Sequence, residues 1–90
     1  MSTPEPGRWC VYIVRCADNS LYTGITTDLE RRLDEHNSAN NGAKYTRPRR
    51  PVRLVYHETA VDRSHASKRE KAIKRLTQQQ KLQLIAGLDD

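Results

Sequence analysis

Two apolar stretches near the start of the chain have the character of β-strands. Residues 9–17 (WCVYIVRCA) and 21–26 (LYTGIT) are rich in β-branched and aromatic side chains. Three polar residues, Asp18, Asn19 and Ser20, separate them and are typical of a tight turn. The pattern predicts a β-hairpin.

The length of the hairpin loop decides which face of the sheet Tyr22 occupies. Side chains alternate across a strand, so Tyr12 shares its face with every second residue, including Cys16. A two-residue turn at positions 18 and 19 would pair Tyr22 with Arg15, on the opposite face. A three-residue loop that extends to Ser20 would pair Tyr22 with Cys16, on the Tyr12 face. A site that both tyrosines share requires the odd-numbered loop.

After the hairpin, the apolar spacing changes to that of an α-helix. Thr27 and Glu30 have the spacing of a capping box with Thr27 as the N-cap, and Leu29 and Leu33 follow one turn apart. We therefore expect a helix over residues 28–37.

The second half of the chain predicts a loop, a strand and two helices. Residues 37–50 are polar and indicate a loop, whereas residues 52–59 (VRLVYHET) alternate and predict a third strand. Residues 62–76 (DRSHASKREKAIKRL) favour a helix and contain no Gly or Pro. Thr77 begins a second capping box, TQQQ, and Gly87 closes the short helix that follows.

The length limits the chain to one domain. Ninety residues with no Phe and one Trp bury a modest core, so we expect a surface groove rather than a deep pocket. We expect a folded core over residues 8–86 between flexible tails at 1–7 and 87–90. No apolar run approaches the ~20 residues of a membrane span, and residues 1–7 lack the apolar core of a signal peptide. We therefore expect a cytoplasmic protein with no membrane partner, and we favour a monomer.

The formal net charge is +5, and the basic residues gather in two segments. Residues 38–57 contain five cations and no acid, and residues 63–81 contain seven cations and one acid, Glu70. Such clusters favour a polyanion such as nucleic acid, although a basic helix taken alone is more commonly a solvated surface. Tyr45 and Tyr56 lie in the first segment, and aromatic rings between cations can stack on bases.

The cysteines and histidines favour no other catalytic or metal chemistry. Cys10 and Cys16 would be about 20 Å apart along a straight strand, too far for the ~6 Å span of a disulfide. A strand cysteine also lacks the basic or helix N-terminal surroundings that lower a thiol pKa, which argues against a thiol nucleophile. No pair of cysteines or histidines has the spacing of a structural zinc site.

Four residues share a spacing that common packing rules do not require. Tyr12 and Tyr22 are ten residues apart, Arg32 follows after ten more, and His36 stands four further on, on the same helical stripe as Arg32. Taken one at a time, each is more often structural. Together they resemble the catalytic motif of the GIY-YIG nuclease superfamily, and the run LYTGITTDLERR is similar to its small stand-alone bacterial members.

The resemblance extends from about residue 9 to residue 82 and carries expectations about fold and activity. It implies an α+β fold in which a three-stranded antiparallel sheet is flanked by helices, in the order β-β-α-β-α-α. It also implies a nuclease that hydrolyses phosphodiester bonds, with DNA favoured over RNA.

The resemblance further implies roles for individual residues. Glu70 matches the glutamate that holds one divalent metal ion, Mg²⁺ or Mn²⁺. Tyr12 would accept the proton of the attacking water, Tyr22 would orient that water or the phosphate, and Arg32 would favour the phenolate and clamp the phosphate charge. His36 would assist as a phosphate donor or as an alternative base.

We expect the basic segments to supply the nucleic-acid contacts. The candidates are Lys44, Tyr45, Arg47, Arg49, Arg50 and Lys74.

The chain departs from the superfamily pattern at three points. Cys10 stands for the first glycine, Ile25 stands where a lysine is often found, and no asparagine follows Glu70. These departures keep two alternatives open. One is a nucleic-acid-binding module of the same fold with weak or lost cleavage, and the other is a small basic RNA-associated protein.

Overall fold

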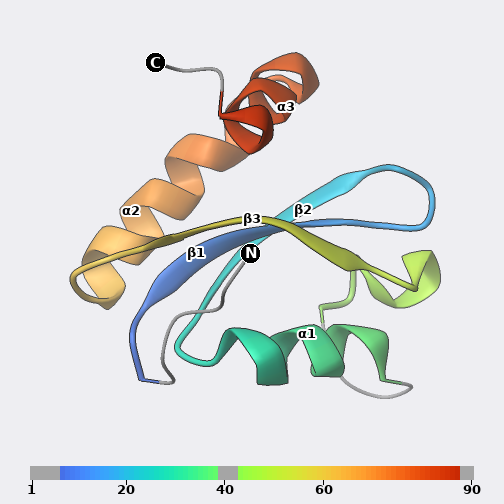
Figure 1. The fold of residues 1–90 in the computed structure, drawn as a ribbon, viewed down its shortest axis with the longest axis horizontal. Coiled ribbons are helices and arrows are strands. Elements are labelled where there is room, and N and C mark those ends of the chain that lie inside the picture. Colours follow the sequence, from blue (N-terminus) through green and yellow to red (C-terminus); the bar gives the residue numbers. More distant parts are fainter. Residues whose placement is uncertain (1–6, 39–42, 88–90) are drawn as a thin grey trace.

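The computed structural model describes residues 7–38 and 43–87, so the tails expected at 1–7 and 87–90 lie outside the described range except for Gly7 and Gly87. The elements occur in the predicted order β-β-α-β-α-α (Figure 1). They are β1 (Cys10–Arg15), β2 (Leu21–Thr26), α1 (Leu29–Asn37), a short 3₁₀ helix η1 (Arg47–Arg49), β3 (Arg53–Thr59), α2 (Arg63–Lys74) and α3 (Gln78–Ala86).

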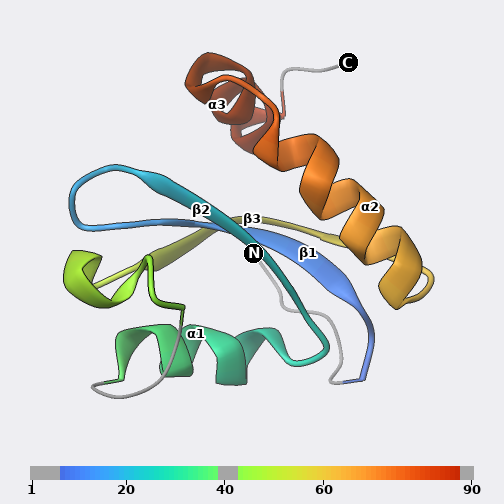
Figure 2. The same ribbon diagram turned by 180° about the vertical axis from the view of Figure 1, so that it is seen from behind.

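The three strands form one antiparallel sheet in the order β2-β1-β3, with helices on both faces. α1 covers one face, and α2 with α3 covers the other, as the two opposite views show (Figures 1 and 2). The predicted α+β fold is therefore confirmed. In the part of the chain that the structure describes, no helix has the length and apolar character to span a membrane.

Each face of the central strand β1 has its own apolar core. Tyr12 and Val14 pack with Leu29 of α1 on one face. Val11 and Ile13 pack on the other face, against the helical residues of a second cluster. That second cluster is centred on Ala66 and Ile73 of α2, with Trp9, Leu21, Ile25, Leu76, Leu84 and Ile85 around them. Because both faces are covered, residues 10–14 are all buried.

The hairpin loop is odd in length, but its register differs from the predicted one. Tyr22 lies opposite Val14 rather than Cys16. Cys16 N–H donates to the Ser20 carbonyl at 2.9 Å, which leaves residues 17–19 as the loop, and Asn19 adopts a positive φ of 69°. A left-handed residue at the end of a three-residue loop is a common hairpin geometry, and asparagine tolerates it. The loop moves by one residue, so the partner of Tyr22 moves by two, from Cys16 to Val14, and Tyr22 stays on the Tyr12 face.

An irregularity in β3 places Leu54 on the face that carries Tyr12. Ile13 pairs with Tyr56, whereas the next residue of β1, Val14, pairs with Leu54, so Val55 is an extra residue. Such a bulge inverts the alternation beyond it. Leu54 therefore joins the core beneath α1.

The start of α1 corrects one sequence prediction. The N-cap is Asp28, whose side chain accepts a hydrogen bond from Arg31 N–H at 3.1 Å, and the helix begins at Leu29. The predicted capping box placed Thr27 in this role and was wrong by one residue. Aspartate is a strong N-cap because its carboxylate satisfies a free N–H and complements the positive end of the helix.

The other two helices begin as expected. Asp62 caps α2, and Thr77 forms a complete capping box with Gln80 at the start of α3. Gly87 ends α3 in the left-handed conformation, as predicted for a C-terminal glycine. Arg69, which falls within the apolar arc of α2 on a helical wheel, instead extends to Glu58 of β3 at 2.8 Å.

The corrected cap of α1 yields a stability prediction. Asp28→Ala should lower the free energy of unfolding by about 1 kcal/mol, because the Arg31 N–H loses its acceptor. Thr27→Ala is the matched control and should cost clearly less. Urea denaturation of both variants measures the difference. Equal or reversed losses would show that Thr27 caps the helix.

Candidate active site

Tyr12 lies at the centre of the site, with its ring across the backbone of the neighbouring edge strand. It is 2% exposed and pairs with Gly24 of β2. A Cβ at position 24 would come within 2.6 Å of Tyr12 Oη and 2.8 Å of Tyr12 Cζ. A side chain at position 24 would therefore collide with the Tyr12 ring, which approaches the β2 backbone closely because this residue is glycine. This contact explains the glycine two residues after Tyr22.

His36 joins α1 to Tyr12 and to the loop that follows α1. Its ring is fully buried, with Nε2 2.8 Å from Tyr12 Oη and Nδ1 2.9 Å from Thr46 Oγ1. The Tyr22 ring approaches the imidazole edge-on, at 5.4 Å between centroids. Both nitrogens are thus engaged inside the protein, so the predicted role of His36 as a phosphate donor does not fit this arrangement.

Burial keeps both partners of the Tyr12–His36 hydrogen bond uncharged at neutral pH. Desolvation raises the pKa of Tyr12 to about 12, and the nearby Arg32 opposes this rise without cancelling it. Desolvation and the positive charge of Arg32 lower the pKa of His36 to about 4. Arg32 thus favours the phenolate, as expected, but in the free protein the cost of burying the charge is larger and Tyr12 stays protonated.

Arg32 lies beside this pair and is held by an acid of its own helix. Its Nη1 is 2.9 Å from Glu35 Oε1, while Arg31 contacts the other oxygen of Glu35 at 3.2 Å. Asp28, one turn before Arg32 on the same helix, caps the helix with its side chain. The Arg32 side chain remains 30% exposed, so a phosphate that approaches from solvent can reach it.

Glu70 lies on α2, which covers the opposite face of the sheet from α1. Its negative charge raises the pKa of Tyr12, which places the two side chains within electrostatic range. The carboxylate is 3.3 Å from Lys74 Nζ, one turn along α2, and its side chain is 19% exposed. The sequence analysis selected Glu70 through the family resemblance and not through its spacing along the chain.

The donor set suits a hard cation with a largely aqueous shell. No group of three or more His, Cys, Asp or Glu side chains is clustered for metal binding within residues 7–38 and 43–87. A site with one carboxylate fits Mg²⁺ or Mn²⁺, since magnesium keeps several waters and is commonly shared with substrate phosphates. It does not fit zinc, which takes three or four protein ligands.

The candidate nucleic-acid residues of the loop divide into two groups. Arg49 lies 4.0 Å above the Tyr45 ring and bonds Asp18 at 3.1 Å, and Arg50 donates to the carbonyls of Arg47 and Ser38. These two arginines are therefore engaged in holding the loop together. Lys44 and Arg47 are exposed and have no acidic side-chain partner among the described residues.

Tyr45 continues an aromatic row from the centre of the site to the surface. It stacks on Tyr22 at 6.0 Å with an angle of 22° between the rings, and it is 41% exposed. Lys74, the remaining candidate contact, pairs with Glu70 on α2.

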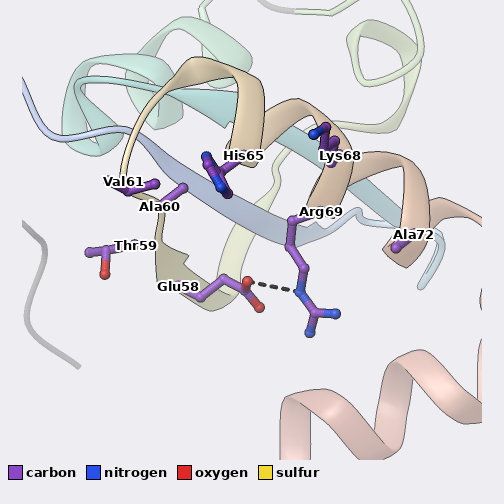
Figure 3. Close-up of a pocket in the computed structure, with 8 residues that line it drawn as sticks. All are labelled: Glu58, Thr59, Ala60, Val61, His65, Lys68, Arg69 and Ala72. Atoms are coloured by element: carbon purple, nitrogen blue, oxygen red, sulfur yellow. Dashed lines mark hydrogen bonds and ion pairs between the residues drawn. The ribbon is translucent and has the colours of Figure 1, made fainter.

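The cavity in Figure 3 lies elsewhere, between the end of β3 and α2. It has a volume of about 470 Å³, and Glu58 and Arg69, which form an ion pair, both line it. None of the predicted catalytic residues lines it. The cavity is therefore separate from the region in which Tyr12, His36 and Arg32 lie together.

Two residues of the site escaped sequence reasoning. Thr46 is fully buried against His36, yet it sits in a polar loop with no periodicity that would mark it. Glu35 was not distinguished from other helix acids, although its spacing to Arg31 and Arg32 was a usable signal.

Known protein families and individual proteins match most of this chain. The family model of the GIY-YIG catalytic domain matches residues 8–83. A UPF0213 protein of Desulfotalea psychrophila is 62% identical over 84 residues, which are 91% of this chain and 76% of that protein. A UPF0213 protein of Staphylococcus haemolyticus is 57% identical over 83% of this chain and 90% of its own length.

Two solution NMR structures are also similar. The UPF0213 protein of Bacillus halodurans has a TM-score of 0.56 and 43% identity, over 88% of this chain and 83% of that chain. A protein of E. faecalis has a TM-score of 0.62 and 42% identity, over 98% of this chain and 91% of that chain.

The buried neutral His36 yields a prediction for stability against pH. Its pKa is about 4 in the folded protein and ~6.5 in an unfolded chain, so the unfolded state binds the proton first as the pH falls. The stabilisation is present above pH ~6.5 and is lost progressively towards pH ~4, by about 3 kcal/mol in all.

Urea denaturation between pH 7 and pH 4 measures this loss, with His36→Gln as the comparison. The variant should lack this component, so that subtracting its pH profile removes the contribution of the carboxylates. Parallel profiles for the two proteins would show that His36 titrates normally.

Proposed function

Because this chain belongs to the GIY-YIG catalytic-domain family, a family of nucleases, we propose that it is a metal-dependent endonuclease. Its substrate would be nucleic acid, and DNA is favoured over RNA. The protein would act as a monomer and hydrolyse the phosphodiester bond at the surface around Tyr12. The observation that carries the proposal is the buried hydrogen bond between Tyr12 and His36 with the partly exposed Arg32 beside it, together with the effect of the Glu70 charge on Tyr12.

Tyr12 and His36 act together as the base in this proposal. A phenol with a pKa of about 12 does not ionise at neutral pH. Tyr12 can therefore accept a proton from water only if it passes its own phenolic proton to another group. His36 Nε2, at 2.8 Å, is in place to accept that proton. A two-step relay of this kind avoids an isolated phenolate, and general-base catalysis typically contributes about 10²–10⁴ in rate.

Bound phosphate would adjust the same pair. In the free protein the charge of Arg32 lowers the pKa of His36, which weakens its proton affinity. A phosphate on the Arg32 guanidinium would offset that charge and raise the pKa of His36, while desolvation, the larger cause of its low value, would remain. The site becomes a stronger base when substrate is present, and Arg32 also stabilises the charge on the phosphorus oxygens.

Glu70 would hold the divalent cation. Such an ion supplies a positive charge for a non-bridging phosphate oxygen and for the leaving oxygen. The chain itself contributes the carboxylate, with Lys74 as its partner until the cation binds. Lys74 would then be released towards the nucleic-acid backbone.

The exposed cations of the loop supply the binding surface. Lys44 and Arg47 lie on either side of Thr46, which is anchored on His36. They would neutralise backbone phosphates next to the site, and Tyr45 provides an aromatic surface between them and Tyr22.

A nucleic-acid-binding module without efficient cleavage is the second candidate. Ile25, at the position of the family lysine, packs in the core beneath α2, so no cation is present there. A cleavage assay on single-stranded, duplex and branched DNA and on RNA, with Mg²⁺, Mn²⁺ or EDTA, separates the two functions. Binding without cleavage of any of these substrates would favour the module.

Glu70→Gln tests the metal site. The variant should lose at least about a hundredfold in the rate of Mg²⁺-dependent cleavage, since each ~1.4 kcal/mol of lost transition-state stabilisation is a factor of ten. Binding in EDTA should be retained or strengthened, because a negative charge near the phosphate path is removed. Asp34→Asn, at an exposed carboxylate of α1, is the control and should cleave normally. A Glu70→Gln protein that cuts at the wild-type rate would refute the assignment.

The division of the loop cations gives a second test. Lys44→Ala and Arg47→Ala should each weaken DNA binding and reduce the slope of log Kd against log salt by about 0.7–0.9, the effect of one lost phosphate contact. Lys68→Ala, beside the cavity of Figure 3, removes the same charge and should leave the slope unchanged. Fluorescence anisotropy in EDTA measures all three. Slopes that do not change for Lys44 and Arg47 would make this loop a solvated surface.

A further inference from the structure

Thr46 is a buried hydroxyl in a polar loop, and its two contacts determine where a proton sits on His36. Oγ1 lies 3.0 Å from the Ala43 carbonyl and 2.9 Å from His36 Nδ1. A carbonyl oxygen accepts hydrogen bonds and cannot donate them. When the single hydroxyl proton of Thr46 points to Ala43, a lone pair of Oγ1 faces the imidazole, so Nδ1 must carry the ring proton.

The neutral ring has one N–H, so this arrangement leaves Nε2 as an acceptor. Tyr12 then donates its phenolic proton to Nε2 at 2.8 Å. Three hydrogen bonds run in one direction, from Tyr12 through His36 and Thr46 to Ala43. Each proton in the chain has an acceptor, and consecutive bonds of this kind reinforce one another in a buried environment.

The reverse arrangement would be less stable. Thr46 would donate to Nδ1, and Nε2 would donate to Tyr12, whose own phenolic proton would lose its acceptor on His36. Tyr12 is 2% exposed, and a buried donor that loses its partner costs about 1–3 kcal/mol. The Ala43 carbonyl also accepts hydrogen bonds from the N–H groups of Thr46 and Arg47, at 3.1 and 3.2 Å, so it has donors in both arrangements. The difference in stability between the two arrangements therefore arises at Tyr12.

We propose that Thr46 is a positioning residue that holds His36 in the Nδ1–H tautomer, so that Nε2 is ready to accept the proton of Tyr12. The proposal deepens the nuclease function proposed above and rests on it for its catalytic meaning. Thr46 never contacts the reacting atoms and acts through His36. A neutral histidine whose other nitrogen is fixed by a hydrogen bond is a general way to orient a base.

The location of Thr46 couples this tautomer to substrate binding. Thr46 precedes η1 and stands between Lys44 and Arg47, the two exposed cations of the loop. The side chain of Asn37 exchanges two hydrogen bonds with the backbone of Val52, at 2.8 and 3.1 Å, and so ties the far end of the loop to α1. The segment that would bind phosphates therefore also orients the base.

The test compares Thr46→Val, which keeps the shape of the side chain and removes the hydroxyl, with Thr46→Ser, which keeps the hydroxyl. The ¹⁵N chemical shifts of the His36 ring should show a protonated Nδ1 in the wild type and in Thr46→Ser, and a gain of Nε2–H in Thr46→Val. The kcat of Thr46→Val should fall by about tenfold to a hundredfold, as is typical when the partner that orients a histidine is lost. The Kd for DNA in EDTA should not change, and Thr46→Ser should restore kcat.

Two readouts keep the inference separate from the proposed function. The ring shifts require no activity, so a wild-type protein that cleaves nothing but shows Nδ1–H refutes the nuclease and supports the tautomer. A wild-type ring with Nε2–H overturns the inference whatever the activity. An unchanged tautomer or an unchanged kcat in a Thr46→Val protein that is folded by circular dichroism also overturns it. Should Thr46→Val fail to fold, the wild-type and Thr46→Ser spectra still decide the tautomer.

Discussion

The hydrogen bond between Tyr12 and His36 connects the central strand of the sheet to α1, and much of the α1 face is arranged around it. The Tyr12 ring can approach the neighbouring strand closely because Gly24 has no side chain. His36 reaches it because Leu29 and Leu33 hold α1 against the same apolar cluster. The bond is buried, so it forms in a medium where hydrogen bonds are strong and unpaired polar groups are costly.

The same burial sets the electrostatics of the site. Neither Tyr12 nor His36 can carry a charge cheaply, which is why the pKa of the phenol rises and that of the imidazole falls. Charged groups stay at the rim, where water reaches them: Arg32 with Glu35 on one side, and Glu70 with Lys74 on the other. In the proposed function, a substrate phosphate would meet the charges at the rim and would act on the buried pair through them.

The two faces of the sheet serve different purposes. The face beneath α2 and α3 holds the larger apolar cluster and stabilises the fold. The face beneath α1 combines apolar packing with the tyrosines and the histidine. Glu70 belongs to a helix of the first face, yet its charge acts on Tyr12 of the second.

The sequence by itself determined the order of the elements and the identity of the motif residues. Alternation and capping signals are local, so they predicted the three strands and the starts of α2 and α3. The same signals could not choose between Thr27 and Asp28 as the cap, since both are good N-caps one residue apart. Nor could they fix the hairpin register, which depends on the conformation of Asn19. The tertiary structure alone decided which cations are free and which polar side chains are buried. Arg49 and Arg50 find partners in segments distant in the sequence, and contacts of the same kind bury Thr46 and His36.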